Sequence, residues 1–214
     1  MDANGGRPAD GPVGLDLVAP EMFAPMLRKL TLAVIGAGVG AGLIAALFLS
    51  WPVALAIGLV VAVPTALSAL ALGRRRIWLT GGVVHARTLL GEQRIEVATA
   101  DGVEMLVYPG RVSRGALRLT GGGRRQLIPL AMYTDTGSGR ELHVLGLRRL
   151  ADALAAGSTA TTVAVSELLV RQLRAEARDA GLQERPLYRA ARLARAKDYV
   201  SPIVLTDREV AELL

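Results

Sequence analysis

The side chains that most often perform catalysis or bind metals are scarce in this sequence of 214 residues. It contains two histidines, His85 and His143, and no cysteine, which excludes disulfides, thiolate catalysis and cysteine zinc sites. No nucleophile elbow, zinc-protease helix or phosphate-binding loop motif occurs. The sequence therefore predicts no enzyme activity, no catalytic residue, no metal site and no cofactor.

One glycine pattern has the form of a dinucleotide-binding site. Gly36, Gly38 and Ala41 match G-x-G-x-x-G/A after a strand-like apolar run. A working fingerprint needs an acidic residue about 20 positions further on to bind the ribose hydroxyls. Residues 30–73 contain no Asp, Glu, Lys, Arg or His. A membrane-tethered redox enzyme is therefore the weakest of our functional hypotheses.

The same glycines fit close packing between helices. Gly36 and Gly40, and Gly38 and Gly42, are each four positions apart, and Gly58 lies in a second apolar run. Small residues at this spacing let helix backbones approach closely in lipid. We expect them to pack the two runs on each other. Contacts between copies of the chain, or with another membrane subunit, are the alternative.

The uncharged stretch has the length of two membrane spans. A spanning helix needs about 20 apolar residues. The runs 30–49 and 53–72 each supply 20, with a break at residues 50–52. We predict a two-helix transmembrane hairpin over residues 28–76, with the lipid bilayer as its first partner.

The charges around the hairpin predict its orientation. Basic residues flank it on both sides, and the loop between the runs carries no charge. These flanking residues are Arg28, Lys29, Arg74, Arg75 and Arg76. The positive-inside rule then places both termini in the cytoplasm of a bacterium, with two spans in its inner membrane.

Residues 77–157 show a different pattern. About seven short β-type runs are separated by glycine-containing turns. An amphipathic helix follows, with Leu147, Leu150 and Leu154 on one side. A hairpin that runs directly into Ile77-Trp78-Leu79-Thr80-Gly81-Gly82-Val83-Val84-His85-Ala86-Arg87-Thr88 resembles the bacterial family of membrane proteins with a PH-like domain.

The resemblance covers residues 28–157 and rests on architecture and pattern. It implies a membrane α + β protein, in which a PH-like β-barrel of about seven strands, capped by a helix, follows the hairpin. It also implies a cytoplasmic domain that acts in binding or assembly. It implies neither enzyme activity nor phosphoinositide binding.

Residues 158–214 read as a helical C-terminal extension, and residues 1–27 as a disordered N-terminus with a short amphipathic lead-in. Arginines recur along one helix of the extension and form a candidate partner face: Arg185, Arg189, Arg192 and Arg195. Packing in cis, on anionic lipid or on a partner protein all remain open. Nucleic acid is not expected, because the extension has a net charge of only +1 and lacks interleaved aromatic residues.

These features favour a non-catalytic, membrane-anchored cytoplasmic binding module. Its role would be that of an accessory or assembly subunit in a larger bacterial membrane complex, with protein partners. The alternative is a homo-oligomeric membrane scaffold, or a module that faces anionic lipid. The sequence names neither the partner nor the pathway.

Overall fold

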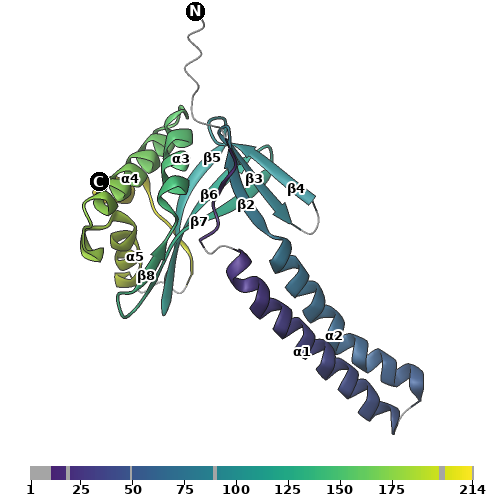
Figure 1. Cartoon of the computed structure of the whole chain (residues 1–214). Coiled ribbons are helices and arrows are strands. Elements are labelled where there is room, and N and C mark those ends of the chain that lie inside the picture. Colours follow the sequence, from purple (N-terminus) through teal and green to yellow (C-terminus); the bar gives the residue numbers. More distant parts are fainter. Residues whose placement is uncertain (1–10, 18–19, 49, 89–90, 198–200, 214) are drawn as a thin grey trace, which may run out of the picture. The chain divides into compact units, whose positions relative to one another are not determined.

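The computed structural model describes residues 11–17, 20–48, 50–88, 91–197 and 201–213. These residues form a mixed α+β chain that divides into two compact units (Figure 1). One unit holds two antiparallel sheets and the C-terminal helices, and the other holds two long apolar helices. The chain leaves the sheet unit after residue 17 and returns to it at residue 77, and the end of β3 and the start of β4, from Arg87 to Gly91, are grouped with the helices. The helix pair is therefore an insertion within the sheet unit.

The inserted unit consists of α1 (Pro20–Ala46) and α2 (Trp51–Arg74). Within them, Arg28–Ala46 and Trp51–Ser68 are long and apolar enough to cross a membrane. Only 11% and 6% of these windows are buried, whereas a core helix of a soluble protein would be mostly buried. The two helices that the hydropathy pattern predicts are thus present. Within α2, the Ser68 hydroxyl donates a hydrogen bond to the Pro64 carbonyl at 2.7 Å.

A four-stranded sheet has the order β1-β2-β3-β4. Gly81 and Gly82 both have positive φ, at 56° and 82°, which a tight hairpin between β2 and β3 requires. The strands are β1 (Val13–Gly14), β2 (Arg76–Thr80), β3 (Val83–Thr88) and β4 (Gly91–Glu96).

Strand β1 changes the description of the N-terminal segment. Val13 pairs with Leu79, and the Leu15 amide donates to the Ile77 carbonyl at 2.8 Å. Leu15 is fully buried. Residues 11–17 are therefore folded, although their composition predicts disorder. They pair with the edge of β2, and Leu15 packs into the hydrophobic core. Residues 1–10 and 18–19 of the predicted disordered segment lie outside the described residues.

The second sheet has five strands in the order β8-β7-β6-β5-β9. Pro129 lies within β7 opposite Ala116, next to a register shift between Gly115 and Ala116. A bulge of this kind accommodates a proline, which cannot donate to the ladder. The strands are β5 (Gly102–Tyr108), β6 (Val112–Gly121), β7 (Arg124–Thr134), β8 (Gly139–Glu141) and β9 (Ile203–Val204).

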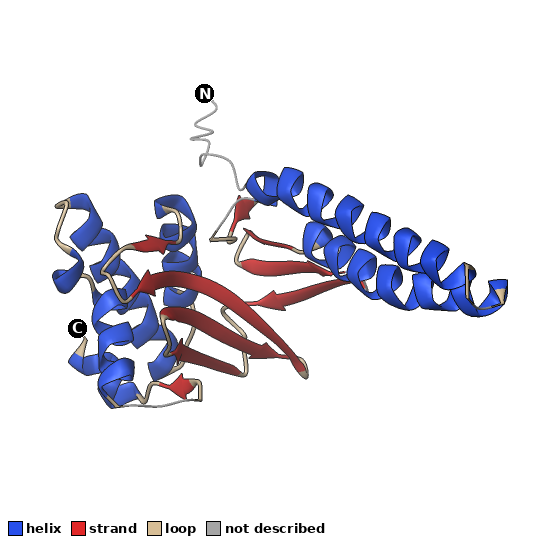
Figure 2. Cartoon of the chain, turned by 90° about the horizontal axis from the view of Figure 1, so that it is seen from below, coloured by secondary structure: helices blue, strands red, loops and turns tan. Residues whose placement is uncertain are grey.

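Helices gather along one side of the five-stranded sheet (Figure 2). One buried cluster joins these helices to Leu117 of β6. It contains Leu150 and Leu154 of α3, Leu168 of α4 and Leu187 of α5. The C-terminal extension therefore packs in cis. Its elements and the preceding helix are α3 (Val144–Ala155), α4 (Ala160–Ala177), the 3₁₀ turn η1 (Leu182–Glu184), α5 (Pro186–Ala196) and α6 (Asp207–Glu212).

Both sheets are open, so the strands do not close into the single barrel that the sequence suggests. Each of β1 and β9 adds two residues to a sheet edge. Strands this short leave no alternating pattern in the sequence, which is why the hydropathy pattern reveals neither of them.

Candidate anion-binding pocket

Helix α4 and its C-cap residue carry three arginines on one side. Arg171, Arg174 and Arg178 are three and four positions apart, a spacing that aligns side chains along one helix face. The opposite side of α4 buries Leu168 and Leu169 in the core. Burial of these leucines fixes the rotation of the helix, and the arginines are therefore held on its outer face.

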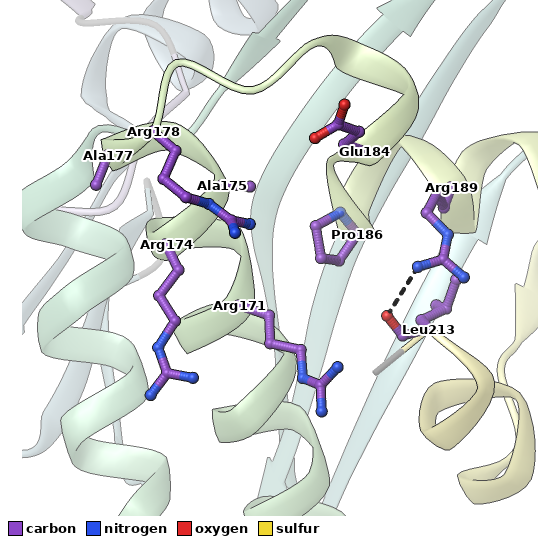
Figure 3. A pocket seen from close by; sticks show the side chains of 9 residues that line it. All are labelled: Arg171, Arg174, Ala175, Ala177, Arg178, Glu184, Pro186, Arg189 and Leu213. Atoms are coloured by element: carbon purple, nitrogen blue, oxygen red, sulfur yellow. Dashed lines mark hydrogen bonds between the residues drawn. The ribbon is translucent and has the colours of Figure 1, made fainter.

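A cavity of about 540 Å³ lies between this face and the elements that follow in the chain. The lining residues come from α4, η1, α5 and the end of α6, and Figure 3 shows them around the opening. They are Arg171, Arg174, Ala175, Ala177, Arg178, Glu184, Pro186, Arg189 and Leu213. Four arginines and one carboxylate thus line a cavity of the size typical for small ligands.

The four guanidinium groups differ in their intramolecular partners. Arg171 donates to Glu167 at 3.2 Å on the exposed side of α4. Arg189 donates to the backbone carbonyls of Leu213, at 3.4 Å, and of Glu212, at 3.2 Å. Within the described part of the chain, no hydrogen bond or ion pair occupies the side chains of Arg174 and Arg178. Glu184 is the one carboxylate in the lining, so the described residues leave the pocket with an excess of positive charge.

A polar network beneath the pocket joins α4 to the sheet and to α5. Glu141 accepts hydrogen bonds from the Tyr133 hydroxyl at 2.5 Å, Gln172 Nε2 at 2.8 Å and Arg185 Nη1 at 2.6 Å. Gln172, fully buried, accepts in turn from the Leu187 amide at 3.1 Å. These bonds set the spacing between the helices that form the two walls.

Tyr133 is the aromatic centre of this network. Burial and the hydrogen bond to the Glu141 carboxylate raise the pKa of the Tyr133 phenol well above its usual value. Its ring meets that of Tyr188 edge to face, with centroids 5.1 Å apart. Tyr133 is therefore a neutral hydrogen-bond donor at every ordinary pH.

The arginines of the predicted partner face are placed as follows. Arg185 pairs with Glu141, and Arg189 lines the pocket. Arg192 donates to Gln183 at 2.6 Å, and Arg195 donates to the Ser113 hydroxyl at 2.6 Å. Only Arg189 of the four reaches the cavity, and every one of them has an intramolecular partner.

The glycines of the apolar runs also separate by position. A Cβ on Gly38 would lie 2.9 Å from the Ala62 Cβ, and one on Gly58 would lie 3.0 Å from the Gly38 carbonyl oxygen. Gly42 likewise approaches α2 closely, whereas a Cβ on Gly36 or Gly40 would meet nothing within 4 Å. Gly38, Gly42 and Gly58 therefore form the contact between α1 and α2, and Gly36 and Gly40 lie outside it.

The remaining predicted residues lie on the surface. The basic side chains that flank the apolar runs are all exposed: Arg28, Lys29, Arg74, Arg75 and Arg76. His85 stacks on Trp78 at 5.2 Å and bonds Glu92 at 2.9 Å, and His143 caps the start of α3. Among the described residues, no group of three or more potential metal ligands occurs.

Sequence reasoning missed the arginines of α4 as site residues. Their spacing along one helix face was visible, but the sequence does not reveal that η1 and α5 fold back over that face. The signal that could have found them is the repetition of like charge at i, i+3 and i+7, with Glu167 as the one acidic residue on the same side.

Comparison with protein-family models, with curated proteins and with solved structures gives no match for this chain. The resemblance to the bacterial PH-like family therefore stays a prediction from the sequence pattern, and the function must be argued from the chain itself.

Proposed function

We propose that this protein is a non-catalytic binding module, anchored in a bacterial inner membrane by α1 and α2. In this proposal its sheets and C-terminal helices face the cytoplasm, where they serve as an accessory or assembly subunit of a membrane complex. The observation that carries the proposal is the exposed apolar surface of the two helices.

That surface is large. Side chains at the turn between the helices are mostly uncovered, including Leu47 at 78%, Phe48 at 82% and Trp51 at 74% exposure. Water would make this much exposed apolar surface an aggregation hazard. Lipid removes the penalty, and both helices satisfy their backbone hydrogen bonds internally, as a membrane requires.

The pairing of β1 with β2 supports a hairpin whose two ends lie on one side of the membrane. Leu15 precedes α1, Ile77 follows α2, and their backbones are hydrogen-bonded. A single sheet cannot form across a bilayer, so this bond favours a hairpin that enters and leaves the membrane on the same side. The basic residues at those ends then favour the cytoplasmic side.

A binding role is supported by the pocket and by the place of the two histidines. His85 and His143 are engaged in a surface stack and a helix cap, and neither lines the arginine pocket. The seven strands β2 to β8, followed by α3, retain the order that a PH-like domain would have. We propose that the two open sheets are a variant of that architecture.

Topology and partners can be tested on the same protein. The chain has no cysteine, so Ser50→Cys in the loop and Ser158→Cys in the sheet unit each give a single labelling site. An impermeant thiol reagent applied to intact cells should label only the loop cysteine. Labelling of the Ser158→Cys variant from outside would refute the orientation.

Partners would be identified by crosslinking native membranes, followed by affinity capture and mass spectrometry. A stoichiometric set of membrane-complex subunits is expected. Recovery of the chain alone, without any partner or self-crosslink, would refute the role as an accessory subunit.

The homo-oligomeric scaffold is kept as a second candidate because of one observation. Gly36 and Gly40 are four apart and point to open space, outside the contact between α1 and α2. Replacing both with leucine should lower the mass of the particle in detergent if they join copies of the chain. An unchanged mass would exclude this interface. Leucine at Gly38 and Gly42 would not be informative, since it would disrupt the hairpin itself.

A further inference from the structure

The arginine-lined cavity contains more positive charge than the fold uses. Its lining residues carry four guanidinium groups and the single carboxylate of Glu184. Like charges at i and i+4 on a helix repel each other, and Arg174 and Arg178 have this spacing. Neither side chain has an ion-pair partner among the described residues. An external anion in the cavity would reduce the repulsion between them.

The charge count favours a doubly charged anion. Glu167 compensates Arg171 in part, and backbone carbonyls satisfy Arg189. The carbonyls leave the charge of Arg189 in place, and Glu184 in the lining offsets one charge as Glu167 does, so the four guanidinium groups leave a net charge of +2. A carboxylate would neutralise only one of these charges, whereas a phosphate monoester carries about −1.5 to −2 charges at pH 7.

The geometry fits the same chemistry. Arginine presents planar donors that match phosphate oxygens in pairs. In Figure 3 Arg171, Arg174 and Arg178 project from α4 on one side of the opening, and Pro186 and Arg189 form the other side. A phosphate between them would receive donors from two different helices, so its binding would depend on the fold as well as on net charge.

We propose that this cavity binds a phosphate monoester group, held chiefly by Arg174 and Arg178 and bounded by Arg189. The group comes either from a soluble phosphorylated molecule or from the headgroup of a phosphatidic-acid-type lipid. The inference rests on the proposed role as a binding module, and it names the chemistry of one of the module's ligands.

The test uses the full chain in phosphatidylcholine nanodiscs, with inorganic phosphate as the probe in isothermal titration calorimetry. The wild-type chain should bind one phosphate, and added sodium chloride should weaken binding because screening acts on exposed charges. Arg174→Gln together with Arg178→Gln should lower the affinity by about tenfold or more, since each removes a charge-assisted hydrogen bond.

A matched variant controls for net charge. Arg111→Gln with Arg114→Gln removes two exposed arginines, three positions apart, from outside the cavity. This control should bind phosphate like the wild type. Because the side chains of Arg174 and Arg178 make no hydrogen bond or ion pair to other described residues, their replacement should not lower the midpoint of thermal unfolding. Lysine at both positions should restore part of the affinity, since it keeps the charge without the planar donors.

The source of the phosphate is distinguished by lipid composition. If a lipid headgroup fills the cavity, nanodiscs with phosphatidic acid should abolish binding of inorganic phosphate, and those with phosphatidylglycerol, a diester, should not. If the ligand is soluble, both compositions should leave phosphate binding intact. Either result supports a phosphate monoester site.

Two results would overturn the inference: no phosphate binding by the wild-type chain, or an equal loss of affinity in the control variant. If these occur while the crosslinked partners and the cysteine labelling remain as expected, only the ligand assignment fails. Loss of the membrane orientation would instead refute the proposed function.

Discussion

The carboxylate of Glu141 offers the sharpest test of how the pocket walls are held together. It receives donors from Tyr133, Gln172 and Arg185, and its side chain is only 9% exposed. Glu141→Gln keeps the shape of the side chain but removes its charge. Arg185, whose side chain is 19% exposed, would then lose its ion-pair partner in a poorly solvated position.

The magnitude follows from this exposure. Removing one partner of a buried ion pair costs about 3–5 kcal/mol, and the partial exposure of Arg185 places the expected loss near 3 kcal/mol. A matched pair lies on the sheet surface, where Glu104 at 41% exposure bonds Arg118 at 28%. Glu104→Gln should cost less than about 1 kcal/mol, because water screens the exposed pair.

The assay is urea unfolding of the full chain in nanodiscs, followed by tryptophan fluorescence. The chain has two tryptophans, Trp51 in α2 and Trp78 in β2. A Trp51→Phe background therefore leaves Trp78 as the reporter of the sheet unit. A loss for Glu141→Gln no larger than that for Glu104→Gln would refute the reasoning.

A second substitution separates the ion pair from the remaining hydrogen bonds. Arg185→Met in the Glu141→Gln background removes the uncompensated charge and should recover about 1 kcal/mol or more of the lost stability. If the double variant is less stable than Glu141→Gln alone, the unpaired charge of Arg185 is not the cause of the loss.

The remaining predictions concern one buried phenol, one surface carboxylate and the helix contact. Because the pKa of Tyr133 is raised in the folded state, stability should be present below pH 10.0 and fall above it, as the unfolded chain loses this proton first. Tyr133→Phe should flatten that fall in urea unfolding, and an equally steep fall would contradict the assignment. Hydrogen bonds from His85, and then from Arg94, hold the pKa of Glu92 below 4.5, so its contribution to stability is present above pH 4.5 and lost on acidification. His85→Phe should raise this pKa in carbon-13 NMR titrations of the glutamate side chains, whereas no change would show that His85 is not the main cause. Gly38→Leu should lengthen spin-label distances between α1 and α2, because the added side chain meets the facing helix. Gly36→Leu should leave these distances unchanged, since its side chain meets nothing there. Equal effects of the two substitutions would contradict the contact.

Local signals in the sequence were sufficient for several elements. Gly81-Gly82 is a two-residue hairpin signal in the sequence, and in the structure the strands 76–80 and 83–88 meet at this turn. Thr206 and Glu209 have the three-residue spacing of a capping box, and both of its hydrogen bonds are present at the start of α6. Both apolar runs form helices. Each of these features depends on residues a few positions apart, so a local pattern in the sequence is sufficient to predict it.

Features that depend on distant residues could not be predicted in this way. Strand β1 is two residues long and exists because β2 offers it a free edge. The pocket combines α4 with α5, whose approach is fixed by Gln172 and Glu141 rather than by any local pattern. The sequence pattern placed Arg185 on a partner face, because its true partner, Glu141, is 44 positions away in the chain.

The pairing of β1 with β2 also sets an order of events during synthesis. Val13 and Gly14 leave the ribosome before α1 and α2, but their partners, Leu79 and Trp78, leave after both. Asp16 and the Ile77 amide that it binds are 61 positions apart. Closing so long a flexible loop would cost roughly 3–4 kcal/mol, beyond a constant, in chain entropy.

In the proposed membrane arrangement, the inserted hairpin removes most of this cost by returning the chain close to where it entered. Completion of the sheet is then coupled to correct insertion. A chain whose second helix failed to cross would carry Ile77 to the opposite side of the bilayer, away from Leu15. Its first strand would stay unpaired and open to proteases, so that misinserted copies would be marked for removal by their own N-terminal segment.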